Sequence, residues 1–409
     1  MHILFLSDNF PPEINAPASR TYEHCREWVL SKSQVTVITC TPNFPNGKVF
    51  DGYQNRLWQS ETVDGIHVIR VWSFIAANEG FIWRILDYLS FMVSVTIAAL
   101  FVRKVDVVIG TSPQFFTACA AWIIGRAKNV PWVFELRDIW PESIKVVGAM
   151  RDSFAIRLLE RLELFLYHHA TCIITVTHSF KSTLIKRGVD GKKIEVVTNG
   201  VDLNHFIPRE KDSNLVDQLM LQGKFVVGYV GTHGMAHGLE TLLDAAQLIQ
   251  NKSDEENICF LFLGNGAKKS ELVREAMMRG LTNVLFLDST SKTDVTRYWS
   301  LLDLSIIHLL KAQLFSSVIP SKLFECMAMG IPILHGVSGE SAQIVITEQI
   351  GEVFESGNAS QLVELLLDLK KDPAKMDRYH RNGIKAAQFY NRSYLAKNML
   401  DILNRLVNK

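Results

Sequence analysis

The sequence lacks the composition that several common classes of protein need. Its 43 basic and 42 acidic residues leave a net charge of +1, so we expect no strongly basic face for nucleic-acid binding. Its cysteines include no C-x-x-C pair, which supports neither a zinc site nor a disulfide framework. They are Cys25, Cys40, Cys119, Cys172, Cys259 and Cys326. We therefore expect a protein of a reducing compartment with no nucleic-acid partner.

We also expect neither a signal peptide nor a membrane-spanning run. The segment 1–8 is predicted to be a strand, because it has neither a basic start nor a small-residue cleavage site. The most apolar stretch, residues 88–102, is shorter than the roughly 20 residues that a membrane span needs. We expect a helix over residues 81–103. It could be buried in a core or rest on a bilayer, since Arg84, Arg103 and Lys104 flank it.

Apolar runs of strand length recur along the chain, separated by segments of helical periodicity. Such alternation predicts parallel sheets that are covered by helices on both faces. A polar segment at 202–224 separates two series of strands. We predict an α/β protein with the GT-B arrangement, in which two Rossmann-like, doubly wound domains face each other across a cleft. The expected domains are residues 1–205 and 206–385, and a helix over 386–409 is expected to pack back toward the first domain.

The segment 320–332 carries the strongest functional signal. Pro320 and Ser321 suit the start of a helix, and Gly330 suits its end. The N-terminus of a helix offers free N–H groups and a partial positive charge, which suits a phosphate. Lys322 adds a full charge, and Glu325 could accept hydrogen bonds from sugar hydroxyls. This pattern predicts a nucleotide-sugar pocket, although an ordinary amphipathic helix with a solvated lysine and glutamate is the alternative.

Four motifs in order resemble those of the retaining GT-B glycosyltransferases that build bacterial surface polysaccharides (glycosyltransferase family 4). They are Asp8–Glu13, Val197–Asp202, Gly264–Gly266 and the segment 320–332. More narrowly, the segments 41–47, 111–113 and 135–142 are similar to those of the L-fucosamine transferases of O-antigen and capsule synthesis. The resemblance implies transfer of N-acetyl-L-fucosamine from a UDP-sugar to a sugar on an undecaprenyl-diphosphate carrier. It also implies a cytoplasmic enzyme that is peripheral at the inner face of the membrane.

The sequence departs from the family pattern at positions that would grip the donor. Many relatives carry two glutamates separated by seven residues; the second matches Glu325, but the first position is Ser317. Thr232 and His237 stand where many relatives have an arginine and a lysine that bind the diphosphate. The resemblance therefore implies that Lys322 and backbone N–H groups carry more of the diphosphate binding here.

The expected donor site stabilises the charge that develops on a departing diphosphate. Its donors would be Lys322, the backbone N–H groups around Ile319–Lys322 at the helix start, where Pro320 itself has none, and the loop that contains Gly231 and Thr232. His237 could donate one hydrogen bond, or it could be a surface loop histidine. Glu325 would bind the ribose, and the backbone at Gly264 and Asn265 could contact base or ribose. No Asp-x-Asp pair stands in a magnesium-binding setting, so we expect neither a metal nor a cofactor besides the donor.

The expected acceptor side lies in the first domain. Arg137, Asp138 and Glu142 follow the carboxyl end of a strand, which is where ligands of such sheets bind. With Lys322 and Glu325, Arg137 and Asp138 complete the expected catalytic set, in which Asp138 could orient the acceptor hydroxyl. An Arg–Asp ion pair that only shapes the loop is the alternative.

Two further residues, Asn15 and Arg20, are expected to contact donor phosphates or acceptor. No protein nucleophile is expected, because the departing phosphate could itself take the acceptor proton. Two other functions stay open from the sequence. One is a UDP-sugar 2-epimerase of the same fold, and the other is a non-catalytic nucleotide-sugar-binding protein.

Overall fold

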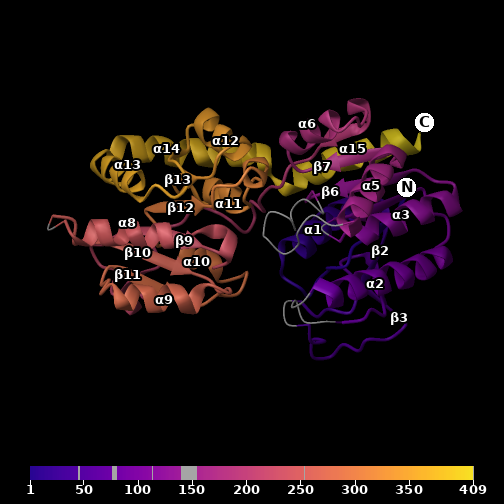
Figure 1. Ribbon diagram of the computed structural model, residues 1–409, viewed down its shortest axis with the longest axis horizontal. Coiled ribbons are helices and arrows are strands. Elements are labelled where there is room, and N and C mark those ends of the chain that lie inside the picture. The colour runs from indigo at the N-terminus through magenta and orange to yellow at the C-terminus, as the bar shows by residue number, and fades with distance from the viewer. Residues whose placement is uncertain (45–46, 76–80, 113, 140–153, 253, 409) are drawn as a thin grey trace. The chain divides into compact units, whose positions relative to one another are not determined.

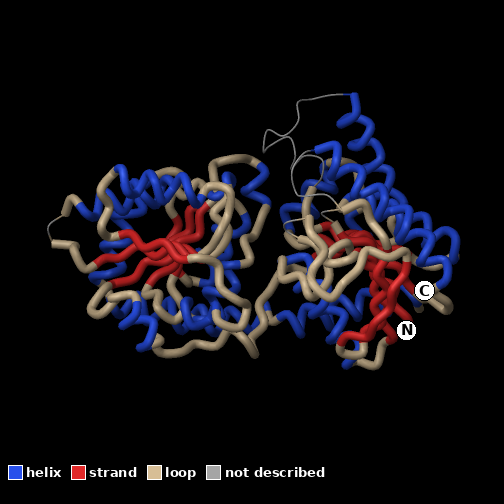
Figure 2. The backbone as a smooth tube through the Cα atoms, turned by 90° about the horizontal axis from the view of Figure 1, so that it is seen from below, coloured by secondary structure: helices blue, strands red, loops and turns tan. Residues whose placement is uncertain are grey.

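The computed structural model describes residues 1–409 except 45–46, 76–80, 113, 140–153, 253 and 409, and it leaves out the side chains of residues 81, 82, 84, 155 and 314 (Figure 1). The chain divides into two compact units. The first comprises Met1–Thr198 and Arg392–Lys409, and the second comprises Asn199–Asn391. Each unit holds its own sheet, drawn red in Figure 2, with helices on both faces. The prediction of two Rossmann-like α/β domains with parallel sheets is confirmed.

The sheet described in the first unit has eight strands in the order β3-β4-β2-β1-β5-β6-β7-β8. They are β1 His2–Leu6, β2 Gln34–Cys40, β3 Trp58–Val63, β4 Ile66–Val71, β5 Val107–Thr111, β6 Trp132–Leu136, β7 Cys172–Thr175 and β8 Ile194–Val196. All neighbours are parallel except β3, which pairs antiparallel with β4 through a turn at Asp64 and Gly65, both with positive φ. Positive φ at two successive residues is typical of the tight turns that join hairpins. The sequence analysis did not predict β3.

Helices cover both faces of this sheet. They are α1 Ala16–Leu30, α2 Phe81–Phe101, α3 Phe115–Lys128, α5 Phe154–His169, α6 His178–Lys186 and α15 Arg392–Val407. Alternate residues of β1 point to opposite faces, so Leu4 packs with α2, α3 and α5 whereas Phe5 packs with α1 and α15. The indole N–H of Trp28 in α1 donates to the Ala396 carbonyl of α15 at 2.8 Å, which anchors the last helix to this unit. Among the described helices, none is long and apolar enough to cross a membrane.

The sheet described in the second unit has six parallel strands in the order β11-β10-β9-β12-β13-β14. They are β9 Phe225–Val230, β10 Ile258–Leu263, β11 Val284–Leu287, β12 Leu304–His308, β13 Ile333–Gly336 and β14 Gly351–Val353. Its helices are α7 Ser213–Gln218, α8 Glu240–Gln250, α9 Lys269–Met278, α10 Val295–Trp299, α11 Lys322–Met329, α12 Glu340–Glu348, α13 Ala359–Lys371 and α14 Pro373–Ala387. The strand order reverses between β9 and β12. Ligands of open α/β sheets bind at the carboxyl ends of the strands that flank such a reversal.

Candidate functional site

The carboxyl ends of β9 and β12 bring together the two segments that the sequence analysis singled out in the second half of the chain. The loop that begins at Gly231 follows β9 directly, and the segment after β12 leads into α11. Helix α11 begins at Lys322 and ends at Met329, and the next residue, Gly330, has a φ of 67°, the left-handed conformation expected just past a helix end. The helix start and stop that the sequence predicted are therefore present, and they lie at the reversal of strand order.

Gly231 makes room for the side chain of Lys322. A Cβ atom at position 231 would lie 2.4 Å from Cε and 2.8 Å from Nζ of Lys322. Gly231 also has a φ of 136°, which side-chain-bearing residues rarely adopt. The lysine side chain thus lies flat against the backbone of the loop after β9. This contact joins the two candidate segments into one site.

The ammonium of the half-buried Lys322 side chain has no anionic partner among the described residues. Its Nζ lies 3.6 Å from the centroid of the Tyr229 ring, close enough for a cation–π interaction. Among the residues that the structure describes, none forms an ion pair or a hydrogen bond with this nitrogen. Burial lowers the pKa of Lys322 to about 7, although Glu325 and Cys326 act in the opposite direction. An anion bound here would supply the charge that the protein does not.

The N-terminus of α11 is uncapped. Ser321 occupies the cap position, but its side chain forms no capping hydrogen bond. The N–H of Leu323 donates to the Pro320 carbonyl and the N–H of Phe324 donates to the Ser321 carbonyl, both at 3.1 Å. The N–H groups of Ser321 and Lys322 have no partner within the described ranges. Ile319 is 5% exposed and packs in the core, so only its backbone is available to a ligand. Two N–H groups and one ammonium therefore converge at this helix end.

The loops after β9 and β10 pack backbone against backbone, which requires glycine at two positions. A Cβ atom at Gly264 would lie 1.9 Å from the Gly231 carbonyl oxygen, and one at Gly266 would lie 2.4 Å from that of His233. The His233 N–H donates to the Asn265 carbonyl at 2.9 Å. The Asn265 side chain is exposed and donates to Ser289 Oγ at 3.0 Å. The Gly-Asn-Gly segment thus shapes the edge of the Lys322 site and presents an exposed amide.

Two histidines of the β9 loop are neutral. Burial, and then the nearby charge of Lys322, lower the pKa of His237 to about 4. Burial, and then Lys269 and Lys322, lower the pKa of His233 to about 4. His237 therefore cannot replace the charge of a lysine, but it can donate one hydrogen bond. Its carbonyl accepts from Nδ1 of His308 at 2.7 Å, which fixes the turn in which it lies.

Two more residues form the floor of this site: Tyr229, which was not predicted from the sequence, and His233, which was expected only as part of the phosphate-binding loop after β9. Tyr229 lies in the apolar strand β9, where its sequence context predicts a core residue. Its ring nevertheless lies under the Lys322 ammonium, and its hydroxyl donates to the carbonyl of Thr232, an exposed residue, at 2.8 Å. His233 is fully buried among Tyr229, Phe262 and Phe286, and neither ring nitrogen has a hydrogen-bond partner in the described part of the chain. Only the position of Tyr229 next to a glycine-rich loop could have indicated a role.

Asn15 and Arg20, the residues expected near the start of α1 to contact a ligand, both have partners within the first unit. Asn15 caps α1 by accepting from the Ala18 N–H at 2.8 Å. Arg20 is 5% exposed; its guanidinium donates to Glu135 at 2.9 Å and to the carbonyl oxygens of Val197 and Thr198. A buried carboxylate and two carbonyls that follow β8 thus hold the Arg20 guanidinium, and its expected contact with donor phosphates or acceptor stays a prediction.

Arg137 and Asp138 follow β6 and lie close to the start of α1. Their backbone N–H groups donate to Ser112 Oγ at 2.7 and 3.2 Å. The Arg137 guanidinium donates to the carbonyls of Ala16 and Pro17, and burial lowers its pKa to about 10 although Glu135 raises it. Arg137 thus holds two loops together, and Asp138 is half-buried beside it. Glu142 lies outside the described residues.

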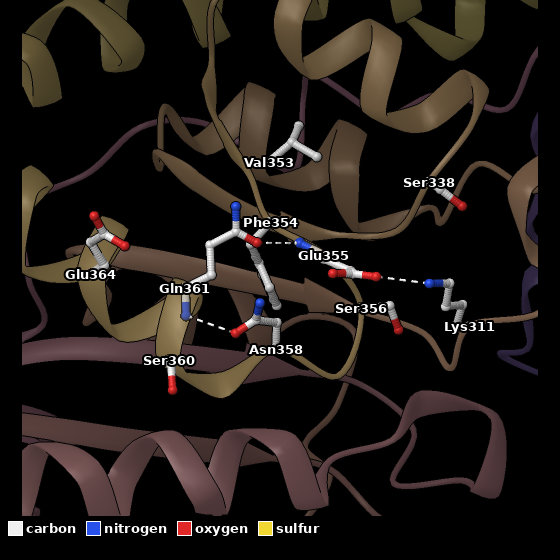
Figure 3. Close-up of a pocket in the computed structure, with 10 residues that line it drawn as sticks. All are labelled: Lys311, Ser338, Val353, Phe354, Glu355, Ser356, Asn358, Ser360, Gln361 and Glu364. Carbon is white, nitrogen blue, oxygen red and sulfur yellow. Dashed lines mark hydrogen bonds and ion pairs between the residues drawn. The ribbon is translucent and has the colours of Figure 1, made fainter.

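A separate pocket of about 650 Å³ opens beyond the carboxyl ends of β12, β13 and β14 (Figure 3). Its lining includes Lys311, Glu355 and Glu364. The Lys311 ammonium is already paired with the Glu355 carboxylate at 2.7 Å, so a diphosphate here would meet excess negative charge. The unpaired Lys322 suits a diphosphate better. Over the residues described, no cluster of three or more His, Cys, Asp or Glu side chains could hold a metal ion.

Two family models match the chain, one for each of its two units. The family described as "Glycosyl transferase 4-like domain" matches residues 15–200, and the family described as "Glycosyl transferases group 1" matches residues 211–386. The chain is 25% identical over 343 residues to the putative colanic acid biosynthesis glycosyl transferase WcaI of Escherichia coli K12, covering 81% of this chain and 82% of that protein. It is 26% identical over 236 residues to the probable glycosyltransferase WbjE of Pseudomonas aeruginosa, covering 57% of each.

Solved structures share the fold over nearly the whole chain. Sucrose-phosphate synthase from Thermosynechococcus elongatus superposes with a TM-score of 0.80 at 16% identity, covering 99% of this chain and 98% of that one. HepE from Anabaena in complex with UDP-glucose superposes with a TM-score of 0.72 at 16% identity, covering 99% of this chain and 100% of that one. At these identities the likeness shows the fold alone.

Proposed function

Because the chain joins a glycosyl transferase 4-like domain to a group 1 glycosyl transferase domain, we propose that it is a retaining glycosyltransferase that uses a UDP-sugar donor. Its proposed acceptor is a sugar on a polyprenyl diphosphate. Its proposed role is in O-antigen or capsule synthesis, and its proposed donor sugar is N-acetyl-L-fucosamine. The relative WcaI, which is named for colanic acid biosynthesis, supports a role in a surface polysaccharide.

The observation that carries this proposal is the unpaired ammonium of Lys322 beside an uncapped helix start. A UDP-sugar presents two phosphates, and the two free N–H groups of α11 together with Lys322 match that charge. HepE has a similar fold and was solved in complex with UDP-glucose, which supports a nucleotide sugar as the ligand. Glu325 lies one turn into α11, where a carboxylate can accept hydrogen bonds from ribose hydroxyls.

The proposed reaction breaks the bond between the sugar C1 and the β-phosphate oxygen and forms a bond between C1 and an acceptor oxygen. Negative charge grows on the departing phosphate, so a fixed ammonium and N–H groups stabilise the transition state more than the ground state. The acceptor hydroxyl loses its proton to the departing phosphate on the same face of the sugar, which retains the configuration at C1. Asp138, after β6 of the first unit, would orient that hydroxyl. We propose that no metal ion takes part.

The test is transfer from a panel of UDP-sugars to synthetic polyprenyl-diphosphate sugars, with products identified by mass and the configuration at C1 by NMR. Lys322→Gln and Glu325→Ala should abolish most of the transfer while the protein stays folded. Lys311→Gln is the matched control, because its ammonium is paired in the neighbouring pocket. Interconversion of free UDP-sugars without acceptor would indicate an epimerase, and donor binding without turnover would indicate a binding protein. Either result would overturn the proposal.

A further inference from the structure

Helix α2 exposes an apolar stripe along its outer face. The stripe consists of Trp83, Leu86, Val93, Ile97, Leu100 and Phe101, which are 43–71% exposed. The spacing of these residues places them on one side of a helix. The opposite side supplies Phe91, Val95 and Ala99 to the core. One face of α2 is therefore buried in the core and the opposite face is exposed. Both faces are apolar, although a face exposed to water usually carries polar side chains.

Aromatic side chains lengthen the stripe at both ends. Phe74, in the segment after β4, stacks on Trp83 with ring centroids 5.7 Å apart. Trp58 of β3 meets Phe101 edge to face at 6.4 Å. Both tryptophans are about half exposed, at 55% and 44%. Tryptophan is enriched where a protein meets the boundary between lipid and water, because its ring is apolar and its N–H is polar.

The exposed charges around the stripe are of one sign, whereas the acidic residues Asp87, Asp106 and Glu160 are only partly exposed. From residue 81 to residue 169, every exposed charged side chain that the structure describes is basic. Arg103 and Lys104 follow α2, Arg126 lies near the end of α3, and Arg157 and Arg161 lie on α5. Helix α3 packs against both α2 and α5, so the three helices form one layer (Figure 1). The whole chain carries a net charge of only +1, so this positive charge is local.

Helix α5 repeats the combination of apolar and basic side chains. Phe154 and Leu158 are 78% and 57% exposed, and they lie beside Arg157 and Arg161. A partner that is apolar inside and negatively charged at its surface would match this layer. A bilayer that contains anionic lipids has this chemistry, and helices with an apolar face and basic neighbours lie in its interface.

We propose that the outer faces of α2 and α5 dock the first unit on a membrane that contains anionic phospholipid. The stripe begins beside Phe74, in the segment that follows β4, and so at the carboxyl edge of the sheet where Arg137 and Asp138 also lie. Docking along α2 would hold that edge at the bilayer surface, where the diphosphate and sugar of a lipid-linked acceptor emerge. The inference deepens the proposed function and rests on it for the identity of the acceptor.

The experiment measures co-sedimentation of the full chain with vesicles of phosphatidylcholine, alone or with about one-third phosphatidylglycerol. The wild type should bind the anionic vesicles, and binding should weaken as salt is raised. Val93→Glu/Ile97→Glu should reduce the partition coefficient about tenfold or more, since two glutamates would have to enter the interface. Arg157→Glu/Arg161→Glu should remove the preference for anionic vesicles.

The matched control is Met277→Glu/Met278→Glu, which places the same charges on exposed residues of α9, 75% and 86% exposed. It should bind vesicles as the wild type does. Circular dichroism and UDP-sugar binding check that all variants are folded. Equal vesicle binding by wild type and the α2 variant would overturn the inference. So would a wild-type dimer that the α2 variant abolishes without any vesicle binding, because the stripe would then join two copies.

Vesicle binding needs no turnover, so its outcome is separate from that of the transfer assay. A chain that binds vesicles through α2 but transfers no sugar would overturn the proposed function and leave the docking surface in place. A chain that transfers sugar to a short, water-soluble acceptor but ignores vesicles would overturn the docking surface alone.

Discussion

Raising the pH from 6 to 8 should weaken the binding of a UDP-sugar about tenfold, because Lys322 titrates in this range. Its pKa is lowered to about 7 by burial in the unliganded protein. A bound diphosphate would raise that pKa, so binding takes up a proton and is strongest below pH 7. With a pKa of about 7, roughly nine-tenths of the lysine is charged at pH 6 and roughly one-tenth at pH 8. The ratio of the charged fractions of Lys322 at pH 6 and pH 8 is about ten, and Kd should change by the same factor.

The two histidines of the loop after β9 do not titrate in this window. His233 and His237 have pKa values lowered to about 4, so both stay neutral from pH 6 to pH 8. The ligand must be a UDP-sugar, because the terminal phosphate of free UDP titrates near pH 6 as phosphate monoesters do. Isothermal titration calorimetry in two buffers of different ionisation enthalpy gives both Kd and the number of protons taken up.

Three variants separate the contribution of Lys322 from other effects. Lys322→Arg keeps its charge at every pH and should bind with a flat profile. Lys322→Gln should bind at least tenfold more weakly at pH 6 and also show a flat profile. Lys311→Gln should behave as the wild type, because the Lys311 ammonium is exposed and paired with Glu355. A wild-type Kd that does not change between pH 6 and pH 8, or a Lys322→Gln variant that keeps the slope, would refute the reasoning.

Three further predictions concern stability and packing. Lys322→Met should raise the Tm of the unliganded protein by a few degrees at pH 6, since it removes an unpaired, half-buried charge, and the gain should shrink toward pH 10, where the lysine is neutral. Gly231→Ala should weaken UDP-sugar binding at least tenfold in calorimetry by displacing Lys322, whereas Gly223→Ala, also at positive φ but with open space, should not. Arg20→Met should lower the free energy of unfolding in urea by about 3–5 kcal/mol, because Glu135 is left buried without its partner; a loss under 1 kcal/mol would contradict the buried ion pair.

The sequence predicted the elements whose signal is local. Strands buried on both faces read as continuous apolar runs, so the strand expected within residues 1–8 is present as β1 His2–Leu6. Helix α11 was found because its proline, glycine and serine mark its ends. Strand β3 was missed because it lies at the edge of the sheet, where its WQSETV sequence alternates half-buried and exposed side chains.

The candidate site was predicted only where its functional residues lie close together in one segment of the sequence. Lys322 and Glu325 lie four residues or fewer from the helix start, so their position follows from the motif. The ion pair of Arg20 with Glu135 was not predicted, because the two residues are 115 positions apart and no local pattern shows that their side chains meet. Tyr229 was missed for the same reason, since its role depends on a lysine from a distant helix.

The most direct measurement is a structure of the chain with a UDP-sugar bound. We predict the diphosphate at the start of α11, with its oxygens within hydrogen-bonding distance of Lys322 Nζ and of the backbone N–H groups of Ser321 and Lys322. A nucleotide in the pocket of Lys311 and Glu355, or anywhere else that leaves this helix end empty, would contradict the assignment.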